Sequence, residues 1–278
     1  MLQTLFFVAA GELGCEPFRP DTGGGSMSIG KERALHPLVF RVGCEPRRGV
    51  IETPCDEAIP LIAHEGCIGI RATNLAASYC RTMQPPGRVL SVNVAHVRPN
   101  PYKSFDVTGI DKRPASGPIE VRAPGMKDGG AGSGLAGDTI GDHESHGGDD
   151  QAVYVYARED LDRWEGELGR TLSPGSFGEN LTTQAVEVNG ALIGERWTIG
   201  DDLVLEITSP RVPCATFRGW MGIPGWLKTF TAASMPGAYL RVVVPGTVSA
   251  GDEIVVSHRP DHEVTVAAMF RSLTISTD

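Results

Sequence analysis

The one cysteine in the second half of the sequence stands at the end of a loop with two prolines. The segment Ser209-Pro210-Arg211-Val212-Pro213-Cys214 directly follows a β-branched, apolar stretch. The fixed positive charge of Arg211, close in sequence, would favour the thiolate over the thiol. A thiolate is the form that binds soft metals. The competing interpretation is a buried, inert cysteine, since unpaired cysteine is among the most buried residue types, and spacing alone leaves both open.

Three other clusters carry groups that could bind an anion or a heterocycle. Lys112 and Arg113 are adjacent cations held by Pro114, although a solvated charged turn is the simpler interpretation. His146, followed by two glycines (Gly147 and Gly148), offers an imidazole and free backbone N–H groups that suit a phosphate or a carbonyl. In the segment PGSFGENL, Asn180 has two donors and an acceptor that could bind the edge of a heterocycle, although the segment could also be an ordinary turn.

The loop around His146 is also rich in acidic and imidazole side chains, which allows a metal site as an alternative. Their spacing fits no known ligand pattern, and the simplest interpretation is a polar loop with one structural histidine. The side chains concerned are Asp138, Asp142, His143, Glu144 and His146.

Short strands with tight turns must position these clusters. Because the apolar and β-branched residues occur in short runs between turns, the sequence predicts a β-barrel or a β-sandwich. The expected strands cover residues 89–97, 119–122, 152–156, 196–199, 203–208, 239–244, 253–257 and 262–267.

One clear helix is predicted over residues 158–168, because Leu161, Trp164 and Leu168 fall on one helical face and Gly169 follows as a C-terminal cap. Residues 217–230 are apolar and aromatic but are interrupted by two glycines and a proline. They therefore predict one or two helical turns rather than one continuous helix.

Composition excludes several classes of function. The chain has 278 residues and a net charge of −9, which disfavours a nucleic-acid partner because phosphate binding needs a basic face. No apolar run reaches the roughly 20 residues that a membrane-spanning helix needs. The sequence has no C-x-x-C pair and no export signal that we recognise, so we expect a cytoplasmic protein without a zinc ribbon or a disulfide framework.

The first third of the chain shows little organisation. Residues 1–82 are interrupted by prolines and contain the linker-like stretch 21–26, and a short helix over 59–79 is the most that they suggest. We expect them to be a poorly ordered extension or the product of a start assigned too early. Residues 83–278 are expected to form the functional domain.

Together these segments resemble a known family. The series GD-x3-D-x3-HGG, AVYxY, PGSFGENL, SPRVPC and PGxVxAGD, running from about residue 89 to about 256, is similar to the MOSC family, named for the C-terminal domain of molybdenum cofactor sulfurase. Order and spacing are closest to its stand-alone bacterial, YiiM-like type, which TGIDKRP at 108–114 also matches. The loop 126–134 is longer than usual in the family, and the C-terminal three-helix extension seen in some relatives is not expected, because few residues follow Ser257.

The resemblance implies a mainly β fold, a mixed-strand barrel like the barrel domain of pyruvate kinase, with a few short peripheral helices. It implies that Cys214 is the protein ligand to molybdenum in a molybdenum cofactor (molybdopterin). The phosphate of the pterin needs cations and backbone donors. The resemblance also implies that Asn180 contacts the pterin or the substrate. The candidates for the phosphate are Lys112, Arg113, His146, Gly147, Gly148 and Arg211.

The activity that the resemblance implies is reduction of small N-hydroxylated bases and related N-oxygenated compounds, with an electron-donor reductase as partner. A carrier of sulfur or sulfurated cofactor, with a persulfide on Cys214, and a non-catalytic cofactor-binding module stay open as alternatives. Pyridoxal phosphate binding is implied only for the family in general. Nothing in this sequence indicates a pyridoxal-phosphate domain. As a loop residue of surface type, Arg211 should be replaceable by alanine with a change in stability below about 1 kcal/mol.

Overall fold

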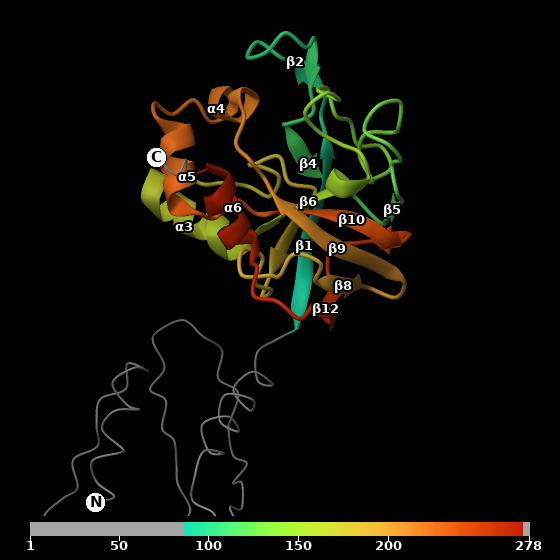
Figure 1. The fold of residues 1–278 in the computed structure, drawn as a ribbon. Coiled ribbons are helices and arrows are strands. Elements are labelled where there is room, and N and C mark those ends of the chain that lie inside the picture. The colour runs from blue at the N-terminus through green and yellow to red at the C-terminus, as the bar shows by residue number, and fades with distance from the viewer. Residues whose placement is uncertain (1–85, 275–278) are drawn as a thin grey trace, which may run out of the picture. The chain divides into compact units, whose positions relative to one another are not determined.

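Within residues 86–274, the part of the chain that the computed structural model describes, seven strands close into a barrel (Figure 1). The barrel order is β12-β8-β9-β10-β6-β7-β1, and β1 pairs back with β12. All neighbours are antiparallel except β6 and β7, which are parallel, so the barrel is mixed as predicted. The strands are β1 (Gly87–Ala95), β6 (Val153–Ala157), β7 (Leu181–Gln184), β8 (Arg196–Ile199), β9 (Leu203–Pro210), β10 (Ala238–Val244) and β12 (Glu253–His258).

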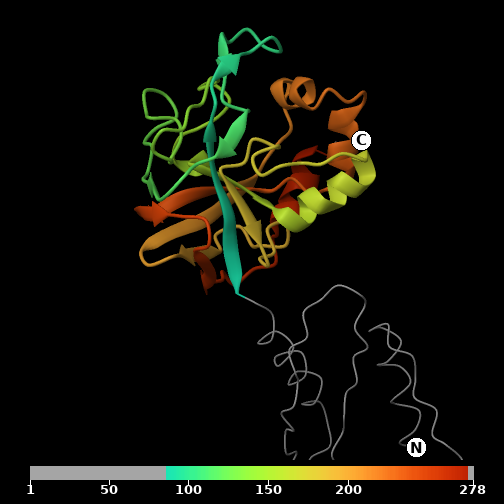
Figure 2. The same ribbon diagram turned by 180° about the vertical axis from the view of Figure 1, so that it is seen from behind.

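Shorter elements extend this barrel. β4 (Lys112–Pro114) pairs with the end of β1, β2 (Arg98–Pro99) pairs with β3 (Val107–Thr108), and β5 (Ile119–Val121) pairs with β11 (Gly246–Val248). A single 3-10 turn, η1 (Asp149–Gln151), precedes β6. The described helices lie together on one side of the barrel in both views (Figures 1 and 2). They are α3 (Arg158–Leu168), α4 (Ala215–Met221), α5 (Trp226–Ala233) and α6 (Val266–Thr274).

Strand β6 separates two hydrophobic clusters because it is buried on both faces. Val153 and Val155 point into the barrel, where they meet the inward residues of the other strands. Tyr154 and Tyr156 point the other way, into an aromatic cluster that joins the barrel to the helices. Several ring pairs of that cluster, such as Trp164 with Trp226 and Phe217 with Phe230, pack edge to face, as aromatic rings prefer. Its fully buried members include Trp164, Phe177, Phe217, Trp226, Phe230 and Phe270.

Most predicted elements are confirmed. The helix α3 has the predicted bounds, and Gly169 ends it in the left-handed conformation at a φ of 63°, with its N–H bonded to Glu165. Residues 217–230 are broken as expected, into the end of α4 and the start of α5. None of the helices among residues 86–274 is long and apolar enough to cross a membrane.

The strand predicted over 262–267 is wrong. Only Thr265 forms a single bridge, to Leu192, and the chain then enters α6 at Val266. Val266 and Phe270, four residues apart, are the buried positions of this helix, so packing at helical spacing prevails over the local alternation. The expectations for residues 1–82, the boundary at Met83 and the helix over 59–79 lie outside the described residues.

One carboxylate on α3 gives a pH-dependent prediction. Burial is the main cause that raises the pKa of Asp160 to about 6, although Asn189 donates a hydrogen bond of 2.6 Å to it. Folding therefore favours the protonated acid, so this group's contribution to stability is present below pH 4 and is lost as the pH rises through 6. Asp160→Asn should raise the free energy of unfolding by about 1 kcal/mol at pH 8 and by nothing near pH 4.

Urea unfolding at several pH values measures this difference. Asp162→Asn is the matched control, because Asp162 lies on the same helix, is largely exposed and pairs with Arg158. A variant at Asp160 that is less stable than the parent at pH 8 would contradict the prediction.

Candidate active site

A cleft beside the end of β6 brings together segments that are far apart in the sequence. The cleft is open to solvent, and its empty space counted together with the solvent at its mouth is about 710 Å³. One wall is the stretch from Asn100 to Lys112, and a second is the loop from Asp138 to Gln151. The others come from the loop before β7, from the β9–α4 connection and from β10.

Six of the eight predicted site residues line this cleft, and two do not. The six come from the β4 strand, the loop after Asp138, the loop before β7 and the β9–α4 connection. Arg113 and Gly148 are not among the lining residues. The six are Lys112, His146, Gly147, Asn180, Arg211 and Cys214.

Cys214 is half-buried in the cleft and stands immediately before α4. Burial by itself raises the pKa of its thiol. The His146 side chain, the charge of Arg211 and the backbone N–H of Phe217 together outweigh that effect and lower the pKa from 9.0 to about 6. At neutral pH the group is therefore mainly a thiolate, which agrees with the reactive interpretation of this cysteine.

Arg211 is a buried cation, with only 5% of the residue exposed. Its guanidinium stacks 3.6 Å from the ring centre of Phe217, and one N–H donates a 3.2 Å hydrogen bond to the Phe177 carbonyl oxygen. None of the ion pairs formed by residues 86–274 joins Arg211 to a carboxylate. The expectation that Arg211 is a surface residue is thus wrong, and its charge faces the thiol of Cys214 instead of an acidic side chain.

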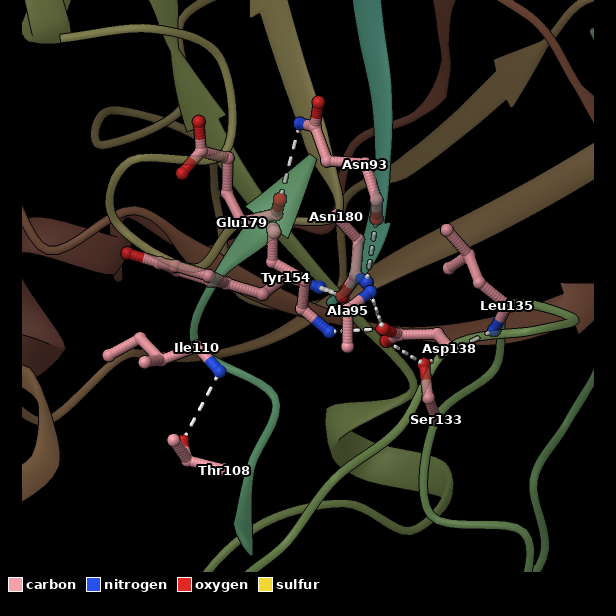
Figure 3. Close-up of polar contacts among 11 residues, drawn as sticks. Asn93, Ala95, Thr108, Ile110, Ser133, Leu135, Asp138, Tyr154, Glu179 and Asn180 are labelled. Carbon is pink, nitrogen blue, oxygen red and sulfur yellow. Dashed lines mark hydrogen bonds and ion pairs between the residues drawn. The ribbon is translucent and has the colours of Figure 1, made fainter. Parts of the chain in front are cut away.

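Lys112 is buried and forms an ion pair with Asp138, which is buried as well. Burial lowers the pKa of Lys112, while the lysine charge and hydrogen bonds hold the pKa of Asp138 below its ordinary value against the opposing effect of burial. Asp138 also accepts hydrogen bonds from Ala95 N–H at 2.8 Å, from the Ser133 hydroxyl at 2.6 Å and from the Asn180 amide at 2.8 Å (Figure 3). The lysine that the sequence offers to a phosphate is therefore already neutralised.

Asn180 lies in the cleft wall, and both polar atoms of its side-chain amide form hydrogen bonds within the protein (Figure 3). Its Oδ1 accepts the Tyr154 N–H at 3.1 Å, and its Nδ2 donates to Asp138. The neighbouring Glu179 is completely buried and accepts the backbone N–H groups of Gly175 at 2.6 Å and Phe177 at 2.9 Å. These two side chains hold the turn in shape, so the geometry gives Asn180 a positioning role rather than a free edge for a heterocycle.

The loop at His146 does not offer the free backbone donors that its glycines suggest. The N–H of Gly147 donates to the Gln151 side chain at 3.3 Å, and the N–H of Gly148 donates to the Gly132 carbonyl at 3.0 Å. The part of this motif that remains available to a ligand is the half-buried imidazole of His146, next to Cys214.

Arg113 belongs to a different face. Its side chain is 58% exposed and pairs with Asp111 at 2.9 Å. His96 at 3.4 Å and Arg98 at 3.5 Å contact the same carboxylate. Although burial opposes it, the hydrogen bond from Arg113 is the main cause that lowers the pKa of Asp111.

The alternative of a metal site in the 138–146 loop finds no support in the geometry. The two aspartates each pair with a lysine, Asp138 with Lys112 and Asp142 with Lys103. Across residues 86–274, no three histidine, cysteine or acidic side chains converge in a way that could hold a metal ion.

A hairpin formed by β2 and β3 reaches across to α4 in both views (Figures 1 and 2). The amide of Asn100 donates a 3.4 Å hydrogen bond to Thr216 of α4. On the other side, Lys103 donates a 2.6 Å bond to Asp142 of the loop that carries His146. The hairpin therefore ties two walls of the cleft together, and no local motif in the sequence indicates this contact.

Tyr154 and Tyr239 line the cleft and were missed by the sequence analysis, which placed both in strands without assigning them a role. Burial is the main cause that raises the pKa of Tyr239 to about 12, with Cys214 adding to the effect and Arg211 opposing it. Both phenols are therefore neutral at physiological pH.

The charge of Arg211 gives a testable effect on the cysteine. In protein produced by a host that makes no molybdopterin, Arg211→Met should raise the pH midpoint of Cys214 alkylation from about 6 by about one unit, because the thiolate loses a cation that stabilises it. Iodoacetamide labelling across a pH series, followed by peptide mass spectrometry, measures it. The control is Arg163→Met, which removes a cation of α3 that pairs with Glu167. An unchanged midpoint in the Arg211 variant would contradict the electrostatic account.

Comparison with known proteins agrees with the motifs. Residues 142–255 match the family model of the MOSC domain. The chain is 31% identical over 179 residues to the uncharacterized protein YflK of Bacillus subtilis (strain 168), an overlap of 64% of this chain and 76% of YflK. It is 28% identical over 181 residues to a reductase of Gibberella moniliformis, where the overlap is 63% of this chain but only 30% of that longer protein.

The fold has a counterpart among solved structures. The crystal structure of YiiM from Geobacillus stearothermophilus aligns with a TM-score of 0.53 over 68% of this chain and 84% of that chain. Sequence identity over the alignment is 24%, so this likeness concerns the fold.

Proposed function

This chain belongs to the MOSC domain family, and from that premise we propose that its cleft holds a molybdenum cofactor with Cys214 as the protein ligand to the metal. The proposal depends most on one observation. Cys214 lies in an open cleft beside a buried arginine that no carboxylate of the described residues neutralises, and these surroundings lower the pKa of its thiol to about 6.

The residues of the cleft fit such a group. A thiolate is a soft donor suited to molybdenum, and Arg211 supplies a cation for an anionic part of the cofactor. Arg113 and the backbone of Gly148 take no part in this proposal, since they face away from the cleft or are already bonded.

When bound, a molybdenum atom with a pyranopterin dithiolene and an oxo group supplies two-electron oxygen-transfer chemistry. The residues of the chain would bind and position this group. Cys214 would hold the metal, and His146 and Arg211 would keep its sulfur ionised. The bonded network of Asp138, Lys112 and Asn180 keeps the opposite wall of the cleft rigid.

We propose that the reaction is the two-electron reduction of a small N-hydroxylated base to the corresponding amine. The N–O bond breaks and its oxygen leaves as water, with two protons taken from solvent and the electrons supplied by a separate reductase. The family membership supports this, and so does similarity to a longer protein that is itself named a reductase. Purified protein, given a chemical electron donor, should convert 6-N-hydroxylaminopurine to adenine. No conversion with several donors, by protein that carries full cofactor, would contradict the enzymatic function.

A sulfur carrier is the second candidate, because the same low-pKa thiol in an open cleft could hold a persulfide. Mass spectrometry of the Cys214 peptide separates the two functions. A persulfide on Cys214 in protein without reductase activity would favour the carrier.

A further inference from the structure

The hydroxyl of Tyr239 is a polar group of the cleft that the cofactor proposal leaves without a role. Three tyrosines lie side by side on β6 and β10: Tyr154, Tyr156 and Tyr239. The Tyr154 hydroxyl donates to the Pro236 carbonyl at 2.8 Å, and the Tyr156 hydroxyl donates to the Met235 carbonyl at 2.9 Å. None of the hydrogen bonds within residues 86–274 engages the hydroxyl of Tyr239.

The fold aims this side chain into the cleft. Tyr239 pairs with Tyr154 across β10 and β6, and the two ring centres lie 5.2 Å apart. On its other side it pairs with Ser209 of β9, five residues before Cys214. The register of β10 against β9 shifts directly after Tyr239, and such a bulge reorients side chains next to binding sites.

A hydroxyl group that is held rigidly in a cleft and has no partner in the protein is a donor available to a ligand. Arg211 stacks on the neighbouring Tyr154 ring at 5.3 Å and on Phe217, so a phenol and a cation lie close to the thiol of Cys214. A hydroxyl group binds the oxygen of an N–OH compound well, whereas the corresponding amine presents no such oxygen.

We propose that Tyr239 donates a hydrogen bond to the N–O oxygen of the substrate and thereby selects N-hydroxylated bases over the amines derived from them. This inference rests on the proposed function, since it assigns a residue to recognition of that substrate class. It makes Tyr239 a residue of specificity, distinct from Cys214 and Arg211, which serve the cofactor.

Binding without turnover tests the assignment. Holoprotein with no electron donor is titrated by calorimetry with 6-N-hydroxylaminopurine and, separately, with adenine. Tyr239→Phe should weaken binding of the N-hydroxylated base about tenfold, the usual effect of one lost hydrogen bond, and leave the affinity for adenine unchanged. Molybdenum content and the thermal midpoint should stay at the parent values, because the ring still packs on Tyr154.

Tyr102→Phe is the matched control, because Tyr102 is an exposed tyrosine of the β2–β3 hairpin and is not among the residues that line the cleft. In this variant the affinities for both ligands should equal those of the parent protein. Equal losses for the two ligands in Tyr239→Phe, or no loss for either, would overturn the assignment. A loss of molybdenum in that variant would also overturn it, because Tyr239 would then contact the cofactor. Parent protein that contains no molybdenum would instead refute the proposed function, and this inference with it.

Discussion

Cys214→Ser should lose more than nine tenths of its molybdenum and at least 100-fold of its reductase activity while keeping its fold. Molybdenum binding depends on a soft thiolate, and the surroundings of Cys214 lower the pKa of its thiol to about 6. Serine has nearly the same shape but replaces the sulfur with a hard oxygen whose proton is not lost at neutral pH. Elemental analysis, the assay with 6-N-hydroxylaminopurine and a thermal melt measure the three effects on one preparation.

The controls for this substitution are the five cysteines of the first 80 residues, at positions 15, 44, 55, 67 and 80. Serine at any of them should leave metal content and activity unchanged, because Cys214 is the one cysteine among the described residues that line the proposed site. Retention of full molybdenum by Cys214→Ser would show that the metal is held by the cofactor's own contacts, and Cys214 would no longer be its ligand.

Lys112→Met should lower the free energy of unfolding by about 3 to 5 kcal/mol, the usual cost of removing one partner from a buried ion pair. The substitution would leave the Asp138 carboxylate buried without its cation, although Ser133, Asn180 and Ala95 still donate to it. Urea unfolding measures the loss. The adjacent Arg113→Ala should cost less than about 1 kcal/mol, because that side chain is largely exposed and forms a surface ion pair.

A double variant separates the loss of a charge from the loss of packing. Lys112→Met combined with Asp138→Leu removes both members of the pair and should recover much of the stability lost in the single variant. If Lys112→Met were as stable as the parent but lost its cofactor, Lys112 would be a cofactor ligand, as the sequence suggested, and the structural role would be wrong.

The fold could be predicted from the sequence because its elements have strong local patterns. The helix α3 places Leu161 and Trp164 on one buried face and ends at a glycine in the left-handed conformation, so its bounds could be read directly. Strand β9 alternates buried and half-buried residues along most of its length. The short strands β2, β3, β4, β7 and β11 were missed, since two to four residues carry too little periodicity, and the start of α6 was mistaken for a strand.

The site could be predicted in part, because the residues of one loop stay together in any fold. Arg211 and Cys214 are three residues apart and do lie in one cleft. Lys112 and Arg113 were treated as equivalent, but neighbours on a strand point to opposite faces, so one is buried against Asp138 and the other is exposed. That distinction requires knowing that β4 exists.

Other features of the site depend on contacts between distant segments. Asp138 receives its hydrogen bonds from residues up to 43 positions away, including Ala95 and Asn180. The glycine N–H groups near His146 are used by partners that only the folded loop brings near. The position of Tyr239 follows from a shift in strand register, which no single segment of the sequence reveals.

Metal and pterin analysis of the unmodified protein is the decisive test of cofactor binding. The protein is purified from a host that makes molybdopterin and is supplied with molybdate, then measured by elemental analysis and by fluorescence of the released, oxidised pterin. We expect about one molybdenum and one pterin per chain. Protein that folds normally but contains neither would contradict it, and Cys214 would then be a reactive thiol with no metal to bind.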